Sequence, residues 1–273
     1  MRKYLSFFTI LLLSACSDNK PEQEKEKTPV KKEETVPSID YKIIAKLPHD
    51  TTSFTQGLVF YKGQLYESTG SPEGVSYTRS VLGPVDLKTG KISVKAELDK
   101  NQFFGEGIVI LNNKLYQLTY KNQIGFIYDV KTFRQTGRFV YQNKEGWGLT
   151  TDGSSLIMSD GTNVLTYLDP VSLKQTKTIN VTNGGYAEDK LNELEYINGY
   201  IYANIWTKNY IVKIDPASGK TVGTIDLSEI VYDAESKHPE SEVLNGIAYD
   251  SISKSIYVTG KLFPTIYQIE FTN

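Results

Sequence analysis

Residues 106–121 read EGIVILNNKLYQLTYK. An acid and a glycine precede a short apolar run, two asparagines make a tight turn, and a second run centred on Tyr116 follows, which is the pattern of a β-hairpin. Four other segments repeat it: QGLVFYKGQLYESTG (56–70), WGLTTDGSSLIMSDG (147–161), NELEYINGYIYANIW (192–206) and NGIAYDSISKSIYVTGK (245–261). One hairpin written five times predicts a repeat architecture.

A second hairpin follows each of the first four. It contains a strand, an aspartate, a short turn and a returning strand, as in GPVDLKTGKISV (83–94), IYDVKTFRQTGRF (127–139), YLDPVSLKQTKTI (167–179) and KIDPASGKTVGTI (213–225). The aspartates are Asp86, Asp129, Asp169 and Asp215. We expect each to open its turn by accepting a hydrogen bond from the backbone two residues further on.

The fifth outer hairpin is split between the two ends of the folded region. YKIIAKLPH (41–49) supplies one strand and TIYQIEF (265–271) the other. Pairing them completes a fifth four-stranded unit and closes a ring, which hides the sheet edges. The anchor residues also recur at the roughly 40- to 50-residue spacing of propeller blades. The sequence therefore predicts an all-β fold, a five-bladed β-propeller over residues 40–273, with a helical turn or extended loop near residues 228–240.

The composition agrees with such a domain. The chain has 273 residues, of which 39% are hydrophobic, with 19 tyrosines and 21 glycines. This is enough apolar content for a substantial core, and it favours strands and turns over long helices. A formal net charge of -2 gives no reason to expect nucleic acid as a partner.

The first 39 residues lie outside the repeat. Residues 1–15 combine a basic start, the apolar run YLSFFTILLL and small residues, which is typical of an export signal. LSAC, ending at Cys16, resembles the bacterial lipobox, whose cysteine is lipidated; the alternative is an ordinary secretory signal ending near a cysteine. Residues 16–39 are rich in charge and proline and predict a disordered tether. We therefore expect a domain exported to the periplasm or outside and lipid-anchored in a bacterial cell envelope.

Alignment of the five units brings one residue of each to the same mouth of the central channel. These residues are Gln56, Glu106, Trp147, Asn192 and Asn245. Glu106 is the only acid among them. Burial among aromatic rings would raise its pKa and suit it to general acid or base catalysis, whereas a neighbouring lysine would keep it ionised. A structural hydrogen bond is the alternative role, and the glycines on either side are expected to leave room for a substrate.

A second ring lies four residues beyond the centre of each returning strand. It consists of Gly70, Tyr120, Gly161, Trp206 and Lys261. Together with Phe54, Phe103, Phe104 and Trp147, this ring predicts an aromatic-walled pocket with few polar groups, the usual composition of a small-molecule site. The alternatives are that the tryptophans belong to the core and that the two asparagines of the first ring cap turns.

Other chemistries find little support. His49 and His238 are far apart in sequence and have no cysteine nearby, so a zinc site is not expected. No catalytic triad motif, phosphate loop or dinucleotide fingerprint is present. Glu195 lies within a predicted buried strand, where we expect a neighbouring blade to satisfy it, although it is a second candidate acid.

Eight segments resemble, in order, the signature blocks of the plant-type glutaminyl cyclases, or glutamine cyclotransferases, which have bacterial members. They are PHDTTSFTQGLVF, QLYESTG, FFGEGI, LYQLTYKN, GWGLTTDG, LNELEYINGYIYANIW, LNGIAYD and VTGKLFP. The resemblance runs from about residue 48 to the end of the chain. It implies a five-bladed propeller that converts the N-terminal glutamine of peptides and proteins to pyroglutamate with release of ammonia, with no metal or other cofactor.

The resemblance also implies roles for single residues. Glu106 of FGEG matches the family's catalytic acid, and the other matching positions imply the substrate pocket: Phe54, Gln56, Phe104, Trp147, Asn192, Trp206 and Lys261. Tyr120 and Phe263 stand where the family usually has tryptophan. Both keep an aromatic face, so we expect Tyr120 to bind substrate and the two departures to alter affinity or substrate range.

Two other functions are consistent with the same residues. A non-catalytic propeller could serve as an envelope binding or scaffold module with the same ring of residues. A glycan-active propeller would also use aromatic residues and carboxylates, but such hydrolases need a pair of acids, and the first ring offers one. We expect the protein to be a monomer.

Overall fold

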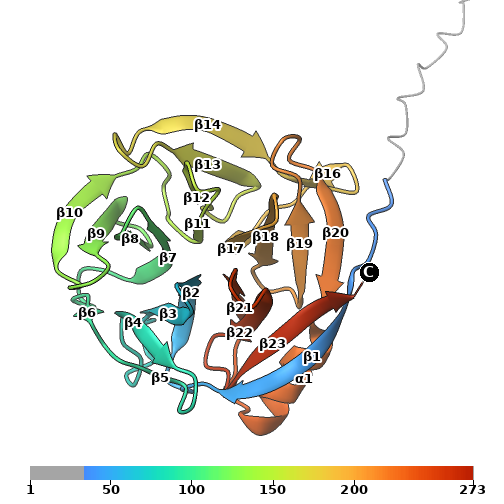
Figure 1. The fold of residues 1–273 in the computed structure, drawn as a ribbon, viewed down its shortest axis with the longest axis horizontal. Coiled ribbons are helices and arrows are strands. Elements are labelled where there is room, and N and C mark those ends of the chain that lie inside the picture. The colour runs from blue at the N-terminus through green and yellow to red at the C-terminus, as the bar shows by residue number, and fades with distance from the viewer. Residues whose placement is uncertain (1–33, 273) are drawn as a thin grey trace, which may run out of the picture. The chain divides into compact units, whose positions relative to one another are not determined.

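Each repeated hairpin forms the two inner strands of one blade in the computed structural model, which describes residues 34–272 (Figure 1). The inner pairs are β2 (Phe54–Tyr61) with β3 (Gln64–Gly70), β7 (Gly105–Leu111) with β8 (Lys114–Thr119), β11 (Leu149–Thr151) with β12 (Leu156–Met158), β17 (Leu191–Ile197) with β18 (Tyr200–Ile205), and β21 (Leu244–Asp250) with β22 (Ser255–Gly260). Asn112 and Asn113 both have positive φ, as the predicted two-residue hairpin turn requires.

The second hairpins form the outer strands of the first four blades. They are β4 (Val81–Asp86) with β5 (Lys91–Ile92), β9 (Ile124–Asp129) with β10 (Gln135–Val140), β13 (Val164–Leu168) with β14 (Gln175–Asn180), and β19 (Tyr210–Ile214) with β20 (Thr221–Asp226). In the first blade the outer strand is interrupted, and β6 (Ala96–Glu97) continues the pairing with β4. All four aspartates accept a hydrogen bond from the backbone two residues on, as predicted.

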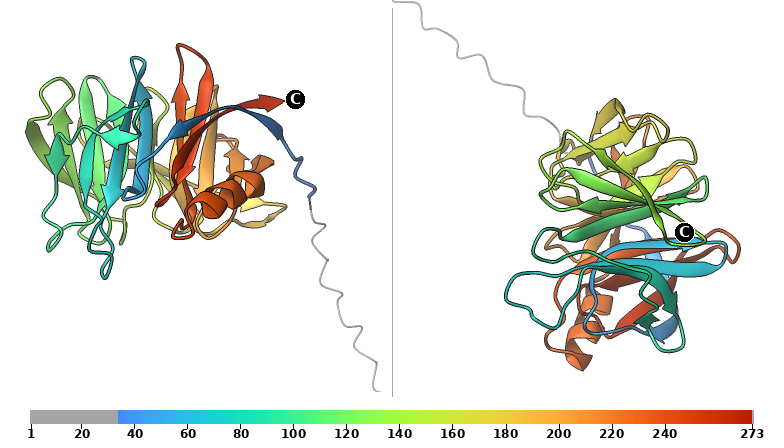
Figure 2. Two further views of the ribbon diagram at one scale, coloured as in Figure 1. Left: turned by 90° about the horizontal axis from the view of Figure 1, so that it is seen from below. Right: turned by 90° about the vertical axis from the view of Figure 1, so that its left-hand side faces the viewer.

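The fifth blade joins the two ends of the domain. β1 (Asp40–Pro48) pairs antiparallel with β23 (Thr265–Thr272), and the sheet order is β1, β23, β22, β21. The prediction of a five-bladed propeller with four-stranded blades, closed by the N-terminal strand, is therefore confirmed. Figure 2 shows the blades from the side, with their strands running from one face of this ring to the other.

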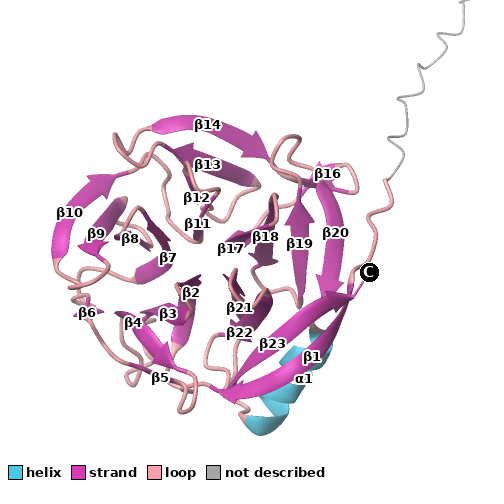
Figure 3. Ribbon diagram, in the orientation of Figure 1, coloured by secondary structure: helices cyan, strands magenta, loops and turns pink. Residues whose placement is uncertain are grey.

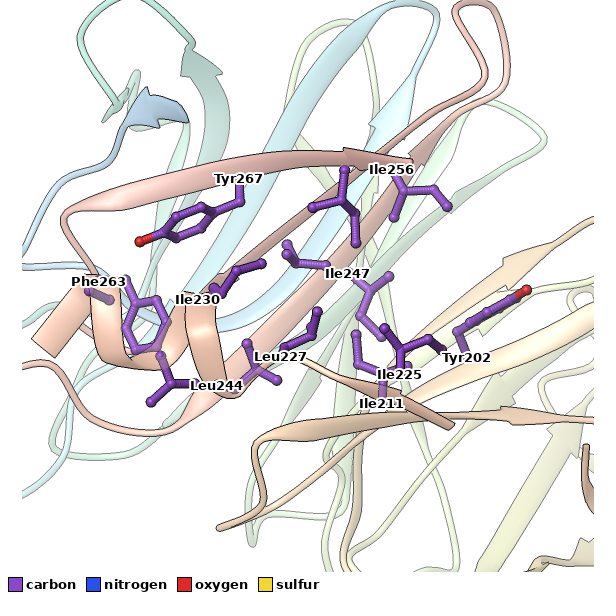
Figure 4. Close-up of a cluster of buried hydrophobic side chains, with 14 of the residues drawn as sticks. Tyr202, Ile211, Ile225, Leu227, Ile230, Leu244, Ile247, Ile256, Phe263 and Tyr267 are labelled. Carbon is purple, nitrogen blue, oxygen red and sulfur yellow. The ribbon is translucent and has the colours of Figure 1, made fainter. Parts of the chain in front are cut away.

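The largest of the hydrophobic clusters lies where the fourth and fifth blades meet α1 (Ser228–Lys237). This helix falls within residues 228–240, where a helical turn or extended loop was expected. Figure 3 shows α1 at the outer side of the ring of strands. Figure 4 shows the cluster, whose labelled members are Tyr202, Ile211, Ile225, Leu227, Ile230, Leu244, Ile247, Ile256, Phe263 and Tyr267. Burying each Leu or Ile side chain contributes about 1.5–3 kcal/mol, so adjacent blades are held together mainly by such contacts.

The short hairpin β15 (Thr182–Asn183) and β16 (Tyr186–Ala187) precedes the fourth blade. The predicted export signal, Cys16 and the first part of the predicted tether lie outside the described residues. The last residues of the predicted tether, 34–39, are described. One of them contacts the fourth blade, because the backbone N–H of Ile39 donates to Thr224 O of β20 at 2.8 Å. Within residues 34–272 we find no helix long and apolar enough to cross a bilayer.

Candidate active site

The five predicted first-ring residues lie at the start of the inner strands. In four blades the register shifts at this point, between Thr55 and Gly57, Gly105 and Ile108, Leu191 and Leu194, and Leu244 and Ile247. Such β-bulges re-aim a side chain and often lie beside active sites. In the remaining blade, Trp147 precedes β11 and its backbone N–H donates to Ser159 O at 3.0 Å.

The glycines at these bulges bring neighbouring blades into contact. A Cβ added to Gly107 would lie 2.5 Å from Trp147 O, and one added to Gly105 would lie 2.7 Å from Thr69 O. The backbone N–H of Gly107 also donates to Trp147 O at 2.7 Å. The expectation that these glycines leave room for a substrate is therefore wrong, because backbone atoms of adjacent strands fill that space.

One pocket of about 280 Å³ gathers the predicted residues. Glu106 and all eight predicted substrate-binding residues line it; the full lining is Phe54, Gln56, Pro72, Phe104, Glu106, Tyr120, Trp147, Asn192, Trp206, Glu242 and Lys261. Pro72 and Glu242 were missed. Both come from segments that connect strands, where no repeat aligns a residue with its counterparts in the other blades.

Three residues predicted to belong to the site region do not line the pocket. Asn245 is fully buried and donates to Gln56 Oε1 at 3.2 Å, so it orients a pocket residue. Phe103 packs against Phe126, with ring centroids 5.2 Å apart, and is not part of the pocket wall. Phe263 is fully buried in the cluster of Figure 4, so its difference from the family pattern lies in the core.

The aromatic side chains form one continuous row along the pocket. Ring centroids are 6.2 Å apart for Phe54 and Phe104, 5.8 Å for Phe104 and Tyr120, 6.5 Å for Tyr120 and Trp147, and 5.7 Å for Trp147 and Trp206. Tyr120 therefore lies within the wall, as expected. Trp206 is 39% exposed and marks the open end of the row.

The second ring contains glycines where aromatic rings need space. A Cβ on Gly70 would come within 2.1 Å of the Phe104 ring, and a Cβ on Gly161 within 2.7 Å of the Trp147 ring. The Trp147 indole is held in place because its Nε1 donates to Glu145 Oε2 at 2.9 Å. These contacts fix the orientation of the wall before any ligand binds.

Glu106 is 3% exposed and accepts a hydrogen bond from Gln56 Nε2 at 3.2 Å. Burial raises its pKa well above the ordinary value; the positive charge of Lys261 lowers the pKa, and the negative charge of Glu145 raises it. The effect of burial on the pKa of Glu106 therefore outweighs that of Lys261, a balance that the sequence could not decide. A carboxyl of this kind exchanges protons nearer to neutral pH than an exposed glutamate does.

Lys261 is buried beside Glu106, with its Nζ 4.7 Å from the centroid of the Phe54 ring. Burial lowers the pKa of Lys261, whereas the carboxylates of Glu106 and Glu242 raise it. Asn192 is 2% exposed. Within residues 34–272, no group hydrogen-bonds the side-chain amide of Asn192 or the Nζ of Lys261, so both can donate to a ligand.

Two further buried glutamates lie outside the pocket and tie the inner strands together. Glu193 accepts from the backbone N–H groups of Leu58 at 3.3 Å and Ile247 at 2.8 Å. Glu195 accepts from the backbone N–H of Tyr249 at 2.9 Å and from Thr150 Oγ1 at 3.4 Å. Neighbouring blades therefore satisfy Glu195, as expected. Burial raises the pKa of both carboxyls, that of Glu195 to about 8.

The two histidines have separate partners. His49 contacts Glu67, whereas His238 lies 3.5 Å from Glu240. In the part of the chain that the structure describes, no three His, Cys, Asp or Glu side chains are grouped as metal ligands would be.

Comparison with known proteins agrees with the family resemblance seen in the sequence. The family model described as glutamine cyclotransferase matches residues 10–271. The chain is 40% identical over 233 residues to the glutaminyl-peptide cyclotransferase of Arabidopsis thaliana, covering 85% of this chain and 71% of the relative. The structure is also similar to the crystal structure of Myxococcus xanthus glutaminyl cyclase, with a TM-score of 0.79, 34% identity, and coverage of 87% of this chain and 98% of the other.

Proposed function

The chain belongs to the glutamine cyclotransferase family, and we propose that it is a glutaminyl-peptide cyclotransferase with Glu106 as its catalytic acid and base. It converts the N-terminal glutamine of peptides and proteins to pyroglutamate and releases ammonia. The observation that carries the proposal is a buried carboxyl of raised pKa in an aromatic pocket, beside two unpaired hydrogen-bond donors. Family membership argues against both a scaffold and a glycan hydrolase, although exposed Glu242 adds a second acid to the pocket.

The reaction joins two groups of one residue. The α-amine nitrogen of the substrate bonds to its own side-chain carboxamide carbon, and the bond from that carbon to the amide nitrogen breaks. Glu106 takes the proton that the amine loses and delivers it to the departing nitrogen, which leaves as ammonia. Holding the residue in a folded conformer supplies much of the rate, because the reaction is intramolecular.

Asn192 and Lys261 are the best placed donors for the negative charge that develops on the carboxamide oxygen. Both residues line the pocket and have donors that no described group uses, and preorganised donors of this kind stabilise such a charge. Gln56 has a different role, because its Nε2 already donates to Glu106. It holds the acid in position rather than the substrate.

The aromatic row binds the aliphatic part of the glutamine side chain and excludes water, which favours cyclisation over hydrolysis. Because Trp206 is partly exposed, the rest of the peptide leaves the pocket at that end. The direct test is to incubate the protein with a peptide that begins with Gln and with the same peptide beginning with Asn. Mass spectrometry should show loss of one ammonia from the first peptide alone, and an unchanged Gln peptide would contradict the proposal.

We also propose that the enzyme works as a monomer held at a bacterial envelope by a lipid on Cys16. The motif LSAC and the charged segment after it support this location, and one chain supplies every pocket residue. In the natural host, Cys16→Ser should move the activity from the membrane fraction to the soluble fraction. Activity that stays with the membrane after this change would contradict a lipid anchor at Cys16.

A further inference from the structure

A buried histidine and glutamate that the reaction does not use lie at the junction between the last and first blades. His49 is on the segment that links β1 to β2, and Glu67 is on β3. Both side chains are fully shielded from solvent. His49 Nε2 lies 3.2 Å from each carboxylate oxygen of Glu67, and Thr55 Oγ1 donates to Glu67 Oε1 at 2.7 Å.

The contacts of the imidazole define its protonation. Nδ1 lies 2.8 Å from the carbonyl oxygen of Phe263, and a carbonyl can only accept, so Nδ1 carries a hydrogen. Thr259 Oγ1 is a longer contact of Nδ1, at 3.3 Å, and its own hydroxyl donates to Thr265 O at 3.0 Å. Nε2 faces a carboxylate, which favours a second hydrogen there. Burial alone would lower the pKa of His49, but the charge and hydrogen bond of Glu67 and the Phe263 carbonyl outweigh it and raise the pKa. Both ring nitrogens of His49 therefore face acceptor oxygens.

This pair connects two segments that carry pocket residues. Phe263 belongs to the turn that begins with Lys261, and the backbone of that turn is tied further by Leu262 N–H donating to Ser53 O at 2.8 Å. On the other side, Thr55 lies between Phe54 and Gln56, both of which line the pocket. A buried ion pair stabilises a fold little compared with apolar residues of the same size, so its presence beside the pocket calls for another role.

We propose that His49 and Glu67 are positioning residues that hold the turn bearing Lys261 against β2, so that the ammonium group keeps its place beside Glu106. This inference rests on the proposed function of the pocket. The hydrogen bond from His49 Nδ1 to Phe263 O is the direct link. Glu67 orients the imidazole through the contacts of its carboxyl oxygens with Nε2.

The position of Lys261 should be visible in the pH dependence of the reaction. The charged and titratable groups that act on Glu106 are Lys261 and Glu145, and the charge of Glu106 in turn acts on Tyr141. Glu242 acts on Lys261 together with Glu106, and Glu67 and Asp50 act on His49. Lys261 lowers the pKa of Glu106. If the turn loosens, that effect weakens, the pKa of Glu106 rises, and the acidic limb of the pH profile of kcat/KM moves to higher pH.

The experiment compares His49→Gln, Glu67→Gln and the control His238→Gln, which changes the other histidine. His49→Gln removes the donor to Phe263 O, and we expect about a 10- to 100-fold loss of kcat/KM with the acidic limb at higher pH. Glu67→Gln keeps an acceptor for Thr55 and a hydrogen bond to a neutral imidazole, so its loss should be smaller. The control should retain the unmodified profile.

A purely structural pair would give a different result. If His49→Gln lowers the melting temperature but leaves kcat/KM and the acidic limb unchanged, the positioning role is wrong. If it does not fold, Thr55→Val tests the same network with little change in volume, and the imidazole ¹⁵N shifts of the unmodified protein should show a hydrogen on Nδ1. An Nδ1 without a hydrogen would overturn the inference, whereas an inactive unmodified protein would overturn the proposed function itself.

Discussion

At Glu106, burial and the ammonium group of Lys261 act on the pKa in opposite directions, and burial prevails. A general base must be ionised to accept a proton, so kcat/KM should fall as the pH drops through the raised pKa of this carboxyl. The acidic limb should therefore lie above the pH at which an exposed glutamate titrates. The pH profile of kcat/KM of the unmodified enzyme measures this limb and is the reference for every variant.

Glu106→Gln should remove most of kcat, about 100-fold or more, with the fold intact. The amide has nearly the shape of the carboxyl but cannot carry a proton from the amine to the leaving nitrogen. Steady-state kinetics and circular dichroism measure the two effects. The matched control is Glu195→Gln, which changes a buried carboxyl outside the pocket and should leave kcat unchanged. Full activity in Glu106→Gln would refute the assignment.

Lys261→Met should lower kcat by about 100- to 1,000-fold, because it removes a donor for the developing oxyanion. It should also raise the pKa of Glu106, since the positive charge of Lys261 lowers that pKa. The acidic limb of kcat/KM would then shift to higher pH. An unshifted limb would mean that the ammonium group and the carboxyl do not interact during the reaction.

At the scale of strands, the hairpin repeat was readable because each tight turn and each turn aspartate imposes a local geometry. The segments between strands obey no such repeat, which is why Pro72 and Glu242 were missed. The choice between Phe103 and Phe104 was open to sequence reasoning: adjacent extended residues face opposite ways, so only one of the two could line the pocket. The glycines of the first ring could not be interpreted without knowing which backbone atoms lie against them.

The contact between inner strands makes Gly107 a sensitive position. Gly107→Ala should destabilise the protein by about 1–3 kcal/mol, the usual cost of overpacking, because the new Cβ meets backbone atoms that cannot move aside. Gly137→Ala is the matched control, since its Cβ would lie 3.6 Å from the nearest atom, a side-chain carbon. Thermal melts should place the control within about 0.5 kcal/mol of the unmodified protein. Equal effects would argue against close packing of the blades at Gly107.

The inner strands also carry a pH dependence of stability. The pKa of Glu195 is raised by burial to about 8, so the folded state keeps a proton that the unfolded chain releases near pH 4.5. The stability that this proton provides is complete below the unfolded pKa and is lost as the pH rises to about 8. Melting temperatures of the unmodified protein should therefore fall between about pH 5 and pH 8.

Glu195→Gln should flatten part of this dependence, because an amide has the shape of the neutral acid and does not ionise. At pH 8 the variant should be more stable by on the order of 4 kcal/mol, or about 8–16 °C in melting temperature. Near pH 4.5 the two proteins should be alike. A variant that melts earlier than the unmodified protein at pH 8 would show that the carboxyl is ionised and stabilising there.

At the scale of the whole propeller, no single blade contains the site. Gln56, Glu106, Trp147, Asn192 and Lys261 come from five different blades. The acid, its partners and the aromatic wall therefore meet only when the ring is closed. The repeat predicted this convergence from the sequence, because equivalent positions of a propeller gather at one mouth of the channel. The position of each side chain along the central channel depends on the β-bulges, which the sequence does not predict.

Closure depends on β1, because this strand covers the edge of β23 and leads directly into the segment that carries His49. Its partly buried residues Tyr41, Ile43 and Leu47 also pack on two of the hydrophobic clusters. An uncovered strand edge is prone to pair with another chain. Removal of residues 1–48 should therefore abolish activity and produce oligomers in size-exclusion chromatography. Removal of residues 1–33 should leave a monomer with the kcat/KM of the unmodified protein. A monomeric, active protein without residues 1–48 would show that the ring does not need its N-terminal strand.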